Sequence, residues 1–319
     1  MTSAPDPKPA IMVLAPLPDF LMEPLRVLGT CHDFYREDEC GRDSMVAEVG
    51  PSIRAIVMAG GSVAPVALLE KLPSLEIITV FGVGYDGVPV DWCRDHNVRV
   101  TNTPDVLTDD VADIAVALVL MTSRQLVQAN HFLHQGDWLK AGYPLAHSLK
   151  GKKAGIVGLG RIGKAIASRL GPLGMQIAWT GRKSQDTPWT YVPELLALAA
   201  QSDFLIVSCP GGASTHHLVN AEVLVALGAQ GTVINISRGS VVDELALITA
   251  LQSNVIRGAG LDVFANEPTV PEALLACPNA VLLPHVGSAT FETRGAMAQL
   301  CLDNLAAHIS GGDLVTPVV

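Results

Sequence analysis

The sequence predicts an α/β protein made of two doubly wound, parallel-sheet domains. The chain has 319 residues, and domains of about 150 residues are typical, so two domains are expected. From residue 10 onward, short runs rich in Ile and Val alternate with longer helical stretches, as in parallel strands joined by helices. This alternation stops after about 100 residues and then begins again, so each series is expected to form its own sheet.

The first series predicts a small open sheet. Its expected strands, each bounded by Gly, Pro or charge, are Ile11–Leu14, Ile53–Met58, Ile77–Val80 and Val98–Thr101. Phe34-Tyr35 is a further strand candidate. Polar residues able to cap a helix then precede an apolar block, so we predict one long helix from Asp105 to about Leu133, running between the domains.

The second series predicts six strands, which make a complete dinucleotide-binding sheet. These strands are Ala154–Val157, Gln176–Thr180, Asp203–Ser208, Thr232–Ile236, Gly258–Asp262 and Val281–Leu283. The helices between them are Arg161–Leu170, Pro193–Ala200, Ala221–Leu227 and Asp243–Leu251. A last helix, Phe291–Ile309, is expected to pack back on the first domain. The predicted domains are therefore 1–102 with 290–319, and 103–289.

Composition and charge exclude several protein classes. Hydrophobic residues make up 49% and charged residues 16%, which excludes a disordered chain. The net charge of 21 − 31 = −10, without a basic stripe, argues against nucleic acid as a partner. The six cysteines are scattered, so neither a disulfide framework nor a metal site is expected.

The same sequence features lead us to expect a soluble, cytoplasmic protein. The longest uncharged runs, Phe204–Ala221 and Ala273–Phe291, contain prolines and histidines and do not resemble membrane-spanning helices. The Pro-rich N-terminal stretch has neither the basic region nor the apolar region of a signal peptide.

The motif Gly158-Leu159-Gly160-Arg161-Ile162-Gly163 follows a predicted strand and opens a predicted helix. Glycines let the backbone approach a pyrophosphate, and the helix N-terminus supplies N–H groups and the positive end of its dipole. Because the mechanism requires this strand–turn–helix context, the motif indicates a Rossmann-type dinucleotide site. The alternative is a tight turn that binds nothing.

The end of the second strand of this sheet indicates which dinucleotide is bound. An NAD site usually has Asp or Glu there, to bind the ribose 2′-OH. Here Gly181-Arg182-Lys183 follows the strand, and the nearest acid, Asp186, lies beyond the basic pair. Since these cations can pair with a 2′-phosphate, NADP(H) is the predicted cofactor and NAD(H) the alternative. The structural alternative is a solvated charged turn.

Three polar residues lie at the carboxyl ends of successive strands, where open α/β sheets bind ligands. Arg238 follows the fourth strand, Glu267 lies in the turn after the fifth, and His285 follows the sixth. Each alone has a structural explanation, but together they favour a catalytic site. An imidazolium can donate a proton, a neighbouring carboxylate favours the protonated ring, and a guanidinium binds a substrate carboxylate. These groups suit reduction of a 2-oxo acid.

Six segments, taken in order, resemble the D-isomer-specific 2-hydroxyacid dehydrogenases, particularly their glyoxylate/hydroxypyruvate reductase-like branch. They are Phe81–Asp86, Thr103–Asp105, Gly155–Gly163, Asn235–Gly239, Gly260–Phe264 and Pro284–Ser288. The resemblance covers nearly the whole chain. It implies a Rossmann domain inserted in a smaller flavodoxin-like substrate domain, and a homodimer joined through the Rossmann domain.

The resemblance also implies a role for individual residues. Arg238 would anchor the substrate, with Glu267 as the partner of the acid/base His285. Val83 and Gly84 would offer backbone N–H groups to the substrate carboxylate. A substrate contact is further implied for Ser288. Cofactor contacts are implied for Arg238 and His285 as well, and for Cys209, Pro210, Thr215, Ile236, Asp262 (on the nicotinamide side) and Gly287.

Three aromatic residues outside this set have weaker expectations. By the same resemblance Trp138 would reach a partner subunit's active site, and the alternative is a core or surface tryptophan. His216 and His217 match no catalytic position of the family, so we expect helix-start or surface residues.

The sequence therefore predicts an NADPH-dependent reductase that converts a small 2-oxo acid, of the glyoxylate/hydroxypyruvate class, to the D-2-hydroxy acid. One alternative is a reductase with the same catalytic residues that acts on 2-ketogluconate or on an aromatic 2-oxo acid. A second alternative is a dinucleotide-sensing protein without turnover. Formate oxidation is disfavoured, because it has no use for proton transfer by a Glu–His pair.

Overall fold

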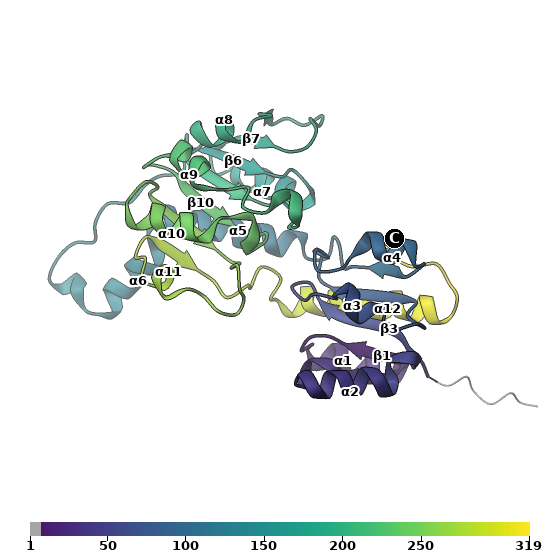
Figure 1. Ribbon diagram of the computed structural model, residues 1–319. Coiled ribbons are helices and arrows are strands. Elements are labelled where there is room, and N and C mark those ends of the chain that lie inside the picture. Colours follow the sequence, from purple (N-terminus) through teal and green to yellow (C-terminus); the bar gives the residue numbers. More distant parts are fainter. Residues whose placement is uncertain (1–7) are drawn as a thin grey trace, which may run out of the picture. The chain divides into compact units, whose positions relative to one another are not determined.

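The computed structural model describes residues 8–319 and contains two sheets, one of five strands and one of seven (Figure 1). The chain divides into two units, each with one sheet. The terminal unit contains the described residues up to Leu107 together with Thr290–Val319, and the central unit contains Thr108–Ala289. All strand pairs in both sheets are parallel, so the predicted α/β class is confirmed.

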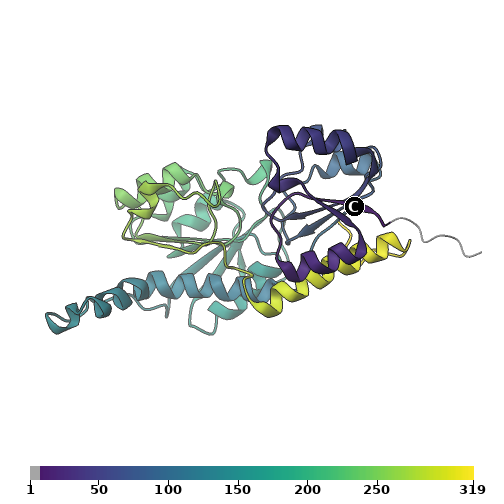
Figure 2. The ribbon, with the colours of Figure 1, turned by 90° about the horizontal axis from the view of Figure 1, so that it is seen from below.

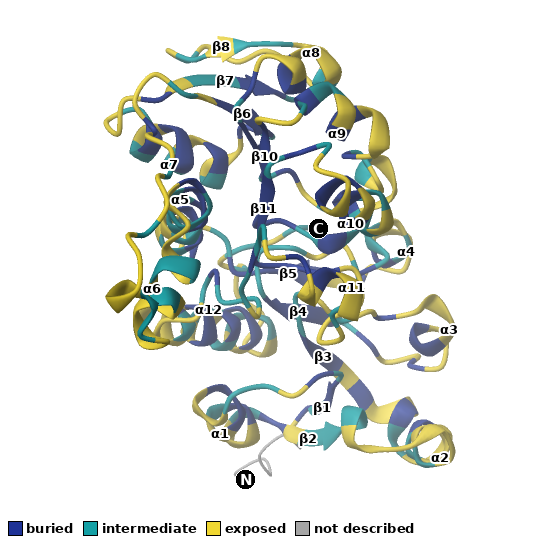
Figure 3. Ribbon diagram, turned by 90° about the vertical axis from the view of Figure 1, so that its left-hand side faces the viewer, coloured by how far each residue is buried: buried dark blue, intermediate teal, exposed yellow. Residues whose placement is uncertain are grey.

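The terminal unit has the flavodoxin-like strand order β2-β1-β3-β4-β5. Its strands are β1 (Ala10–Val13), β2 (Thr30–Asp33), β3 (Ile53–Ala59), β4 (Ile77–Phe81) and β5 (Arg99–Thr101). Its α-helices are α1 (Asp19–Leu28), α2 (Glu39–Val49), α3 (Val66–Leu69), α4 (Val90–Asp95) and α12 (Phe291–Ile309). Figure 3 shows α1 and α12 on one face of the sheet and α2, α3 and α4 on the other. As predicted, α12 returns to this unit and packs on β4 and α1.

The strand expected at Phe34-Tyr35 is wrong by a few residues. The strand is β2, and Phe34–Arg36 forms a 3-10 turn directly after it. Because β2 is an edge strand with no fully buried residue, no apolar run marks it in the sequence. The ring of Phe34 instead packs against the core from the turn.

The central unit has the strand order β12-β11-β10-β9-β6-β7-β8. Its strands are β6 (Lys153–Val157), β7 (Gln176–Thr180), β8 (Thr190–Tyr191), β9 (Phe204–Val207), β10 (Thr232–Asn235), β11 (Gly258–Leu261) and β12 (Ala280–Leu282). From β8 to β11 this is the Rossmann order, and β12 extends it by one strand. All six predicted strands are present. The seventh, β8, was not predicted, because it has only two residues, which pair with Ala178 and Trp179.

Helices cover both faces of the central sheet. The α-helices of this unit are α5 (Thr108–Arg124), α6 (Leu126–His134), α7 (Arg161–Leu170), α8 (Leu195–Ala200), α9 (Ala221–Leu227), α10 (Glu244–Gln252) and α11 (Glu272–Leu275). Figure 3 shows α5 and α7 on one face, with α8, α9 and α10 on the other. The strands between them are buried on both sides, which explains why apolar residues fill β9 and the middle of β10 in the sequence.

The single long helix predicted from Asp105 to about Leu133 is two helices. The helix breaks at Gln125, whose φ of 50° is left-handed, and α6 begins at the next residue. The Tyr143 hydroxyl donates a hydrogen bond to the Gln125 carbonyl at 3.2 Å. Since α5 packs on α7, β10 and β11 within the central unit, the expectation of a helix running between the domains is also wrong.

Residues 8–319 contain no helix that is long and apolar enough to cross a membrane. The His, Cys, Asp and Glu side chains in that part of the chain form no group of three or more that could hold a metal ion.

Asp203, which precedes β9, fixes the amino end of the central sheet. Its carboxylate accepts hydrogen bonds from Lys152 Nζ at 2.7 Å and from the Lys153 N–H at 2.9 Å. Burial opposes ionisation, but these donors outweigh it and lower the pKa of Asp203. A lowered pKa gives stability that is present above the ordinary value of 3.8 and lost as the pH falls through the lowered pKa.

We therefore expect Asp203→Asn to reduce the free energy of unfolding at pH 7 by about 1 kcal/mol, since solvent screens part of the interaction. The difference from the unsubstituted protein should shrink as the pH falls below 3.8. Urea unfolding at several pH values measures it. Asp91→Asn is the control, because Asp91 is 95% exposed and pairs only at the surface with Arg94. Equal effects of the two substitutions would contradict the prediction.

Candidate active site

Arg238 follows β10 and is held by a turn of polar residues. The Ser237 N–H donates to Asn235 Oδ1 at 3.1 Å, and Asn235 Nδ2 donates to the Arg238 carbonyl at 2.9 Å. Arg238 Nη1 donates to the Ser237 carbonyl at 2.9 Å, and the Ser237 hydroxyl donates to the Cys209 carbonyl. The buried side chain of Asn235 thus fixes the backbone on both sides of the Arg238 turn.

Gly239, directly after Arg238, allows a second loop to pass against this turn. A Cβ atom at Gly239 would lie 1.9 Å from the carbonyl carbon of Phe264, which real atoms cannot do. Only glycine fits between these backbones. The turn carrying Arg238 and the loop leading from Phe264 to Glu267 are therefore in direct contact.

Glu267 and His285 form a short hydrogen-bonded pair. His285 Nδ1 lies 2.6 Å from Glu267 Oε2, and the Phe264 N–H donates to Glu267 Oε1 at 2.9 Å. Burial opposes ionisation of Glu267, but the hydrogen bond and charge of His285, the Phe264 N–H and the Arg238 guanidinium outweigh it and lower the pKa of Glu267. The central unit therefore brings all three predicted polar residues into one electrostatic cluster.

Asp262 fixes the loop that carries His285. Its carboxylate accepts the Val286 N–H at 2.7 Å and the Gly287 N–H at 2.8 Å, one on each oxygen. His285 itself has a φ of 52°, which is rare for a residue with a side chain. Asp262 is 1% exposed, and burial raises its pKa against the effect of the two N–H donors. A buried carboxylate thus holds the loop in the conformation that presents His285 to Glu267.

The glycine motif forms a turn that fits a pyrophosphate. Gly158 has a φ of 96°, and a Cβ there would lie 2.7 Å from Cys209 Cα. A Cβ at Gly163 would lie 2.2 Å from the Gly158 carbonyl oxygen, so this glycine allows α7 to pack closely. A Cβ at Gly160 would meet no atom within 4 Å. Space is therefore open at the N-terminus of α7, where phosphate oxygens can accept backbone N–H groups.

The remaining predicted cofactor residues of the central unit lie at the same edge of its sheet. Parallel pairing of β6 with β7 and β9, and of β9 with β10, brings their carboxyl ends together. Gly181, Cys209 and Ile236 follow these ends. The Pro210 carbonyl accepts the Thr215 hydroxyl at 2.7 Å, which closes the loop after β9. Burial raises the pKa of the adjacent Cys209 thiol to about 11, so this thiol is neutral.

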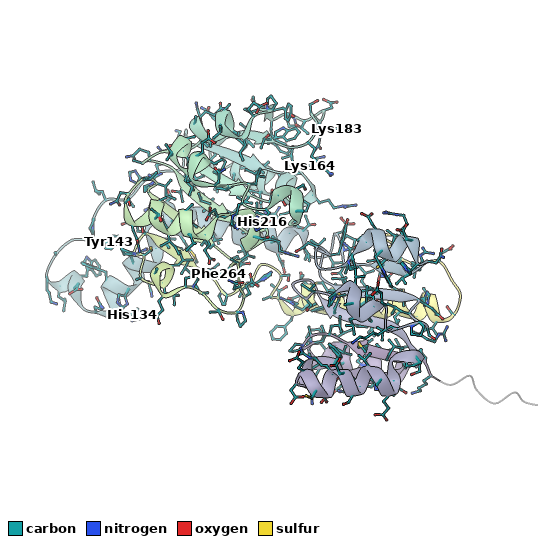
Figure 4. All side chains as sticks on the ribbon, in the orientation of Figure 1. His134, Tyr143, Lys164, Lys183, His216 and Phe264 are labelled. Atoms are coloured by element: carbon teal, nitrogen blue, oxygen red, sulfur yellow. The ribbon has the colours of Figure 1, made fainter. Side chains whose placement is uncertain are left out.

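The basic pair after β7, Arg182 and Lys183, is exposed. Within the part of the chain that the structure describes, neither Arg182 nor Lys183 forms an ion pair. Figure 4 shows the Lys183 side chain projecting away from the central sheet. Gln185 anchors the same loop, because its Nε2 donates to the Leu159 carbonyl at 3.0 Å. Gln185 is not among the residues predicted from the sequence, since it belongs to no motif and no sequence signal marks it.

Two predicted substrate residues lie in the terminal unit and not in this cluster. Val83 and Gly84 belong to the loop after β4. The Val83 carbonyl accepts Asn102 Nδ2 at 2.8 Å, and the Thr103 N–H donates to the Gly82 carbonyl at 2.9 Å. The loop is therefore fixed within its own unit.

The other aromatic candidates are surface residues. Trp138 is 68% exposed in a 3-10 turn after α6. His216, labelled in Figure 4, and His217 follow the turn Ala213–Thr215. Both are exposed, and their rings stack with centroids 3.9 Å apart. Ser288 follows Gly287 and is partly buried.

Comparison with known proteins places this site in a family. The profile of the D-isomer specific 2-hydroxyacid dehydrogenase NAD-binding domain matches residues 116–287. Hydroxyphenylpyruvate reductase of Plectranthus scutellarioides is 48% identical over 269 residues, covering 84% of this chain and 86% of the relative. The 2-ketogluconate reductase of Gluconobacter oxydans is 42% identical over 313 residues, covering 98% of this chain and 99% of the relative.

A solved structure is similar over the same length. It is the NADPH-dependent glyoxylate/hydroxypyruvate reductase of Sinorhizobium meliloti in complex with NADP and malonate. It is 46% identical to this chain with a TM-score of 0.89, and the match covers 98% of this chain and 97% of that one. The profile match over more than half of the sequence and these full-length relatives show that the chain belongs to the D-isomer-specific 2-hydroxyacid dehydrogenases, as an NAD(P)-dependent reductase of 2-oxo acids.

Proposed function

We propose that the protein uses NADPH to reduce a small 2-oxo acid of the glyoxylate/hydroxypyruvate class to the D-2-hydroxy acid. The observation that carries the proposal is the 2.6 Å pair of His285 and Glu267 beside the charge of Arg238. The exposed basic pair Arg182-Lys183, where NAD enzymes place an acid, supports the choice of cofactor. The similar reductase solved with NADP and malonate supports both choices.

Each charged residue has one task in this mechanism. Arg238 binds the substrate carboxylate and polarises the carbonyl group. His285 donates a proton from Nε2 to the carbonyl oxygen, since Nδ1 faces Glu267. Glu267 stays ionised because its pKa is lowered, and its negative charge stabilises the imidazolium before the proton leaves. Bound NADPH supplies the hydride that C2 receives.

The remaining predicted residues are proposed to bind and orient the substrate and the cofactor. Gly158, Gly160 and Gly163 would hold the pyrophosphate at the N-terminus of α7. Val83 and Gly84 would donate backbone N–H groups to the substrate carboxylate. Ser288 would contact the substrate. Contacts with the cofactor are proposed for Leu159, Arg161, Ile162, Gly181, Cys209, Pro210, Thr215, Ile236, Asp262 and Gly287.

His285→Ala should lower kcat for 2-oxo acid reduction by a factor of about 10² to 10⁴, because the proton donor is lost. NADPH binding, measured by fluorescence titration, should change little, since the glycine turn is untouched. The matched control is His96→Ala, which alters a surface histidine stacked on Trp92. Unchanged turnover in His285→Ala would remove the acid/base assignment.

Initial rates with glyoxylate, hydroxypyruvate, 2-ketogluconate and phenylpyruvate, each with NADPH and NADH, test the substrate and the cofactor. We expect the highest kcat/KM with NADPH and one of the two smallest acids. Joint replacement of Arg182 and Lys183 by Ala should lower kcat/KM for NADPH by about 10- to 100-fold, because charge-assisted bonds to a phosphate are lost, and should spare NADH.

The outcomes of this assay separate the alternatives. A preference for NADH would contradict the role of the basic pair. Fastest turnover of 2-ketogluconate or phenylpyruvate would favour the activities named for the Gluconobacter and Plectranthus relatives. Absence of turnover with every pair would favour a dinucleotide sensor.

We also propose that the protein is a homodimer joined through the central unit. No residue of α6 is buried, and apolar side chains on it and on the turn after it are exposed. They are Leu126, Val127, Leu133, Trp138 and Leu139. Figure 2 shows α6 continuing past α5, away from the strands of its unit, and Figure 4 labels His134 at its end. A second copy that covers these side chains would remove them from water.

Light scattering after gel filtration should give about twice the 33.5 kDa mass of one chain. Replacing Leu133 and Leu139 together by Glu should give the monomer mass, because two charges would be buried in the interface. Leu275→Glu, at a 61% exposed position on α11, is the control and should stay dimeric. A monomer mass for the unsubstituted protein would refute the proposal.

A further inference from the structure

The loop after β7 is anchored at two points. At its start, the Tyr191 hydroxyl donates to the Gly181 carbonyl at 3.1 Å. Four residues further along, Gln185 Nε2 donates to the Leu159 carbonyl at 3.0 Å. The residues between these two anchors are Arg182, Lys183 and Ser184, and all three are exposed.

The second anchor joins this loop to the glycine turn itself. Leu159 stands between Gly158 and Gly160, so its carbonyl belongs to the turn that would receive the pyrophosphate. A backbone hydrogen bond from the Gly158 N–H to the Thr180 carbonyl at 2.9 Å already joins the two strand ends. The Gln185–Leu159 hydrogen bond is a second link, beyond the basic pair. The loop is therefore hydrogen-bonded to the glycine turn on both sides of Arg182 and Lys183.

A loop that is anchored at both ends loses less conformational entropy when its long cationic side chains bind a phosphate. Arg and Lys lose much rotamer freedom when they are fixed, and a mobile backbone beneath them would add to this cost. The support below the start of the loop is rigid, since the buried Trp179 ring packs on Tyr191 with centroids 4.7 Å apart. On the other side of Arg182 and Lys183 the loop has no regular structure, and there Gln185 anchors it through its hydrogen bond to Leu159.

We propose that Gln185 is a positioning residue for cofactor selection, which holds Arg182 and Lys183 where a 2′-phosphate must lie. The inference rests on the proposed use of NADPH. Gln185 is proposed to act through the loop, because its Nε2 donates to the Leu159 carbonyl of the glycine turn. Its loss should therefore weaken binding of the dinucleotide that carries the 2′-phosphate more than binding of the one that lacks it.

The test compares Gln185→Met with Gln201→Met in the full chain. Met keeps the length of the side chain but removes the amide donor. Gln201 is the matched control, because its Nε2 also donates to a backbone carbonyl, that of Ala197 at 3.2 Å, but within α8. Dissociation constants for NADP⁺ and NAD⁺ are measured by titration calorimetry, so the readout does not depend on turnover.

Gln185→Met should weaken NADP⁺ binding by about 3- to 10-fold and NAD⁺ binding by less than about 2-fold, as expected for one hydrogen bond. Gln201→Met should change neither. In a chain that also carries Arg182→Ala and Lys183→Ala, the effect of Gln185→Met on NADP⁺ should disappear, because the residues it positions are gone.

The remaining outcomes overturn the inference and identify the step that fails. Equal weakening of both dinucleotides, or no weakening of either, would show that Gln185 does not act through the basic pair. If removing Arg182 and Lys183 left NADP⁺ affinity intact, the proposed cofactor site itself would be wrong. If their removal weakened NADP⁺ binding but Gln185→Met did not, only the positioning role would be lost.

Discussion

The two hydrogen bonds accepted by the carboxylate of Asp262 are the interaction on which the candidate active site depends. They fix the Val286 and Gly287 N–H groups, and so hold His285 in a left-handed conformation that costs about 1–2 kcal/mol in a residue with a side chain. Asp262 is placed by the buried strand β11, so the position of His285 follows from the packing of the sheet.

The strands that the sequence predicts best are those buried on both faces. Parallel strands between two layers of helices bury both faces, so apolar residues fill every position of β9, and such runs are visible without a structure. Edge strands lack this signal. The strand β8 has only two residues, and β2 has no buried residue. Neither strand therefore forms an apolar run that stands out from the sequence around it. At the helix break, the Gln125 carbonyl accepts a hydrogen bond from Tyr143, which lies 18 residues further along the chain, so no local pattern marks this contact.

In the candidate site, too, some features could be predicted from the sequence and others could not. Residues at the carboxyl ends of parallel strands meet at one edge by the geometry of the fold, which is why Arg238, Glu267 and His285 could be grouped from the sequence. The contact between the Arg238 turn and the Phe264 loop could not be predicted, because Gly239 matters only through the atoms that pass it. The bond from Gln185 to Leu159 likewise depends on how a loop without regular structure folds.

The division of the chain into units also determines the order in which its parts can fold during synthesis. The central unit is one continuous segment, Thr108–Ala289, so all its strands are available once that segment has left the ribosome. Residues of the terminal unit up to Leu107 are made earlier, but α12, which packs on β4 and α1, follows the central unit in the chain. Until α12 emerges, the part of the sheet face that it covers beside α1 is open to water and to the chaperones that bind such faces. The part translated first is therefore the part completed last.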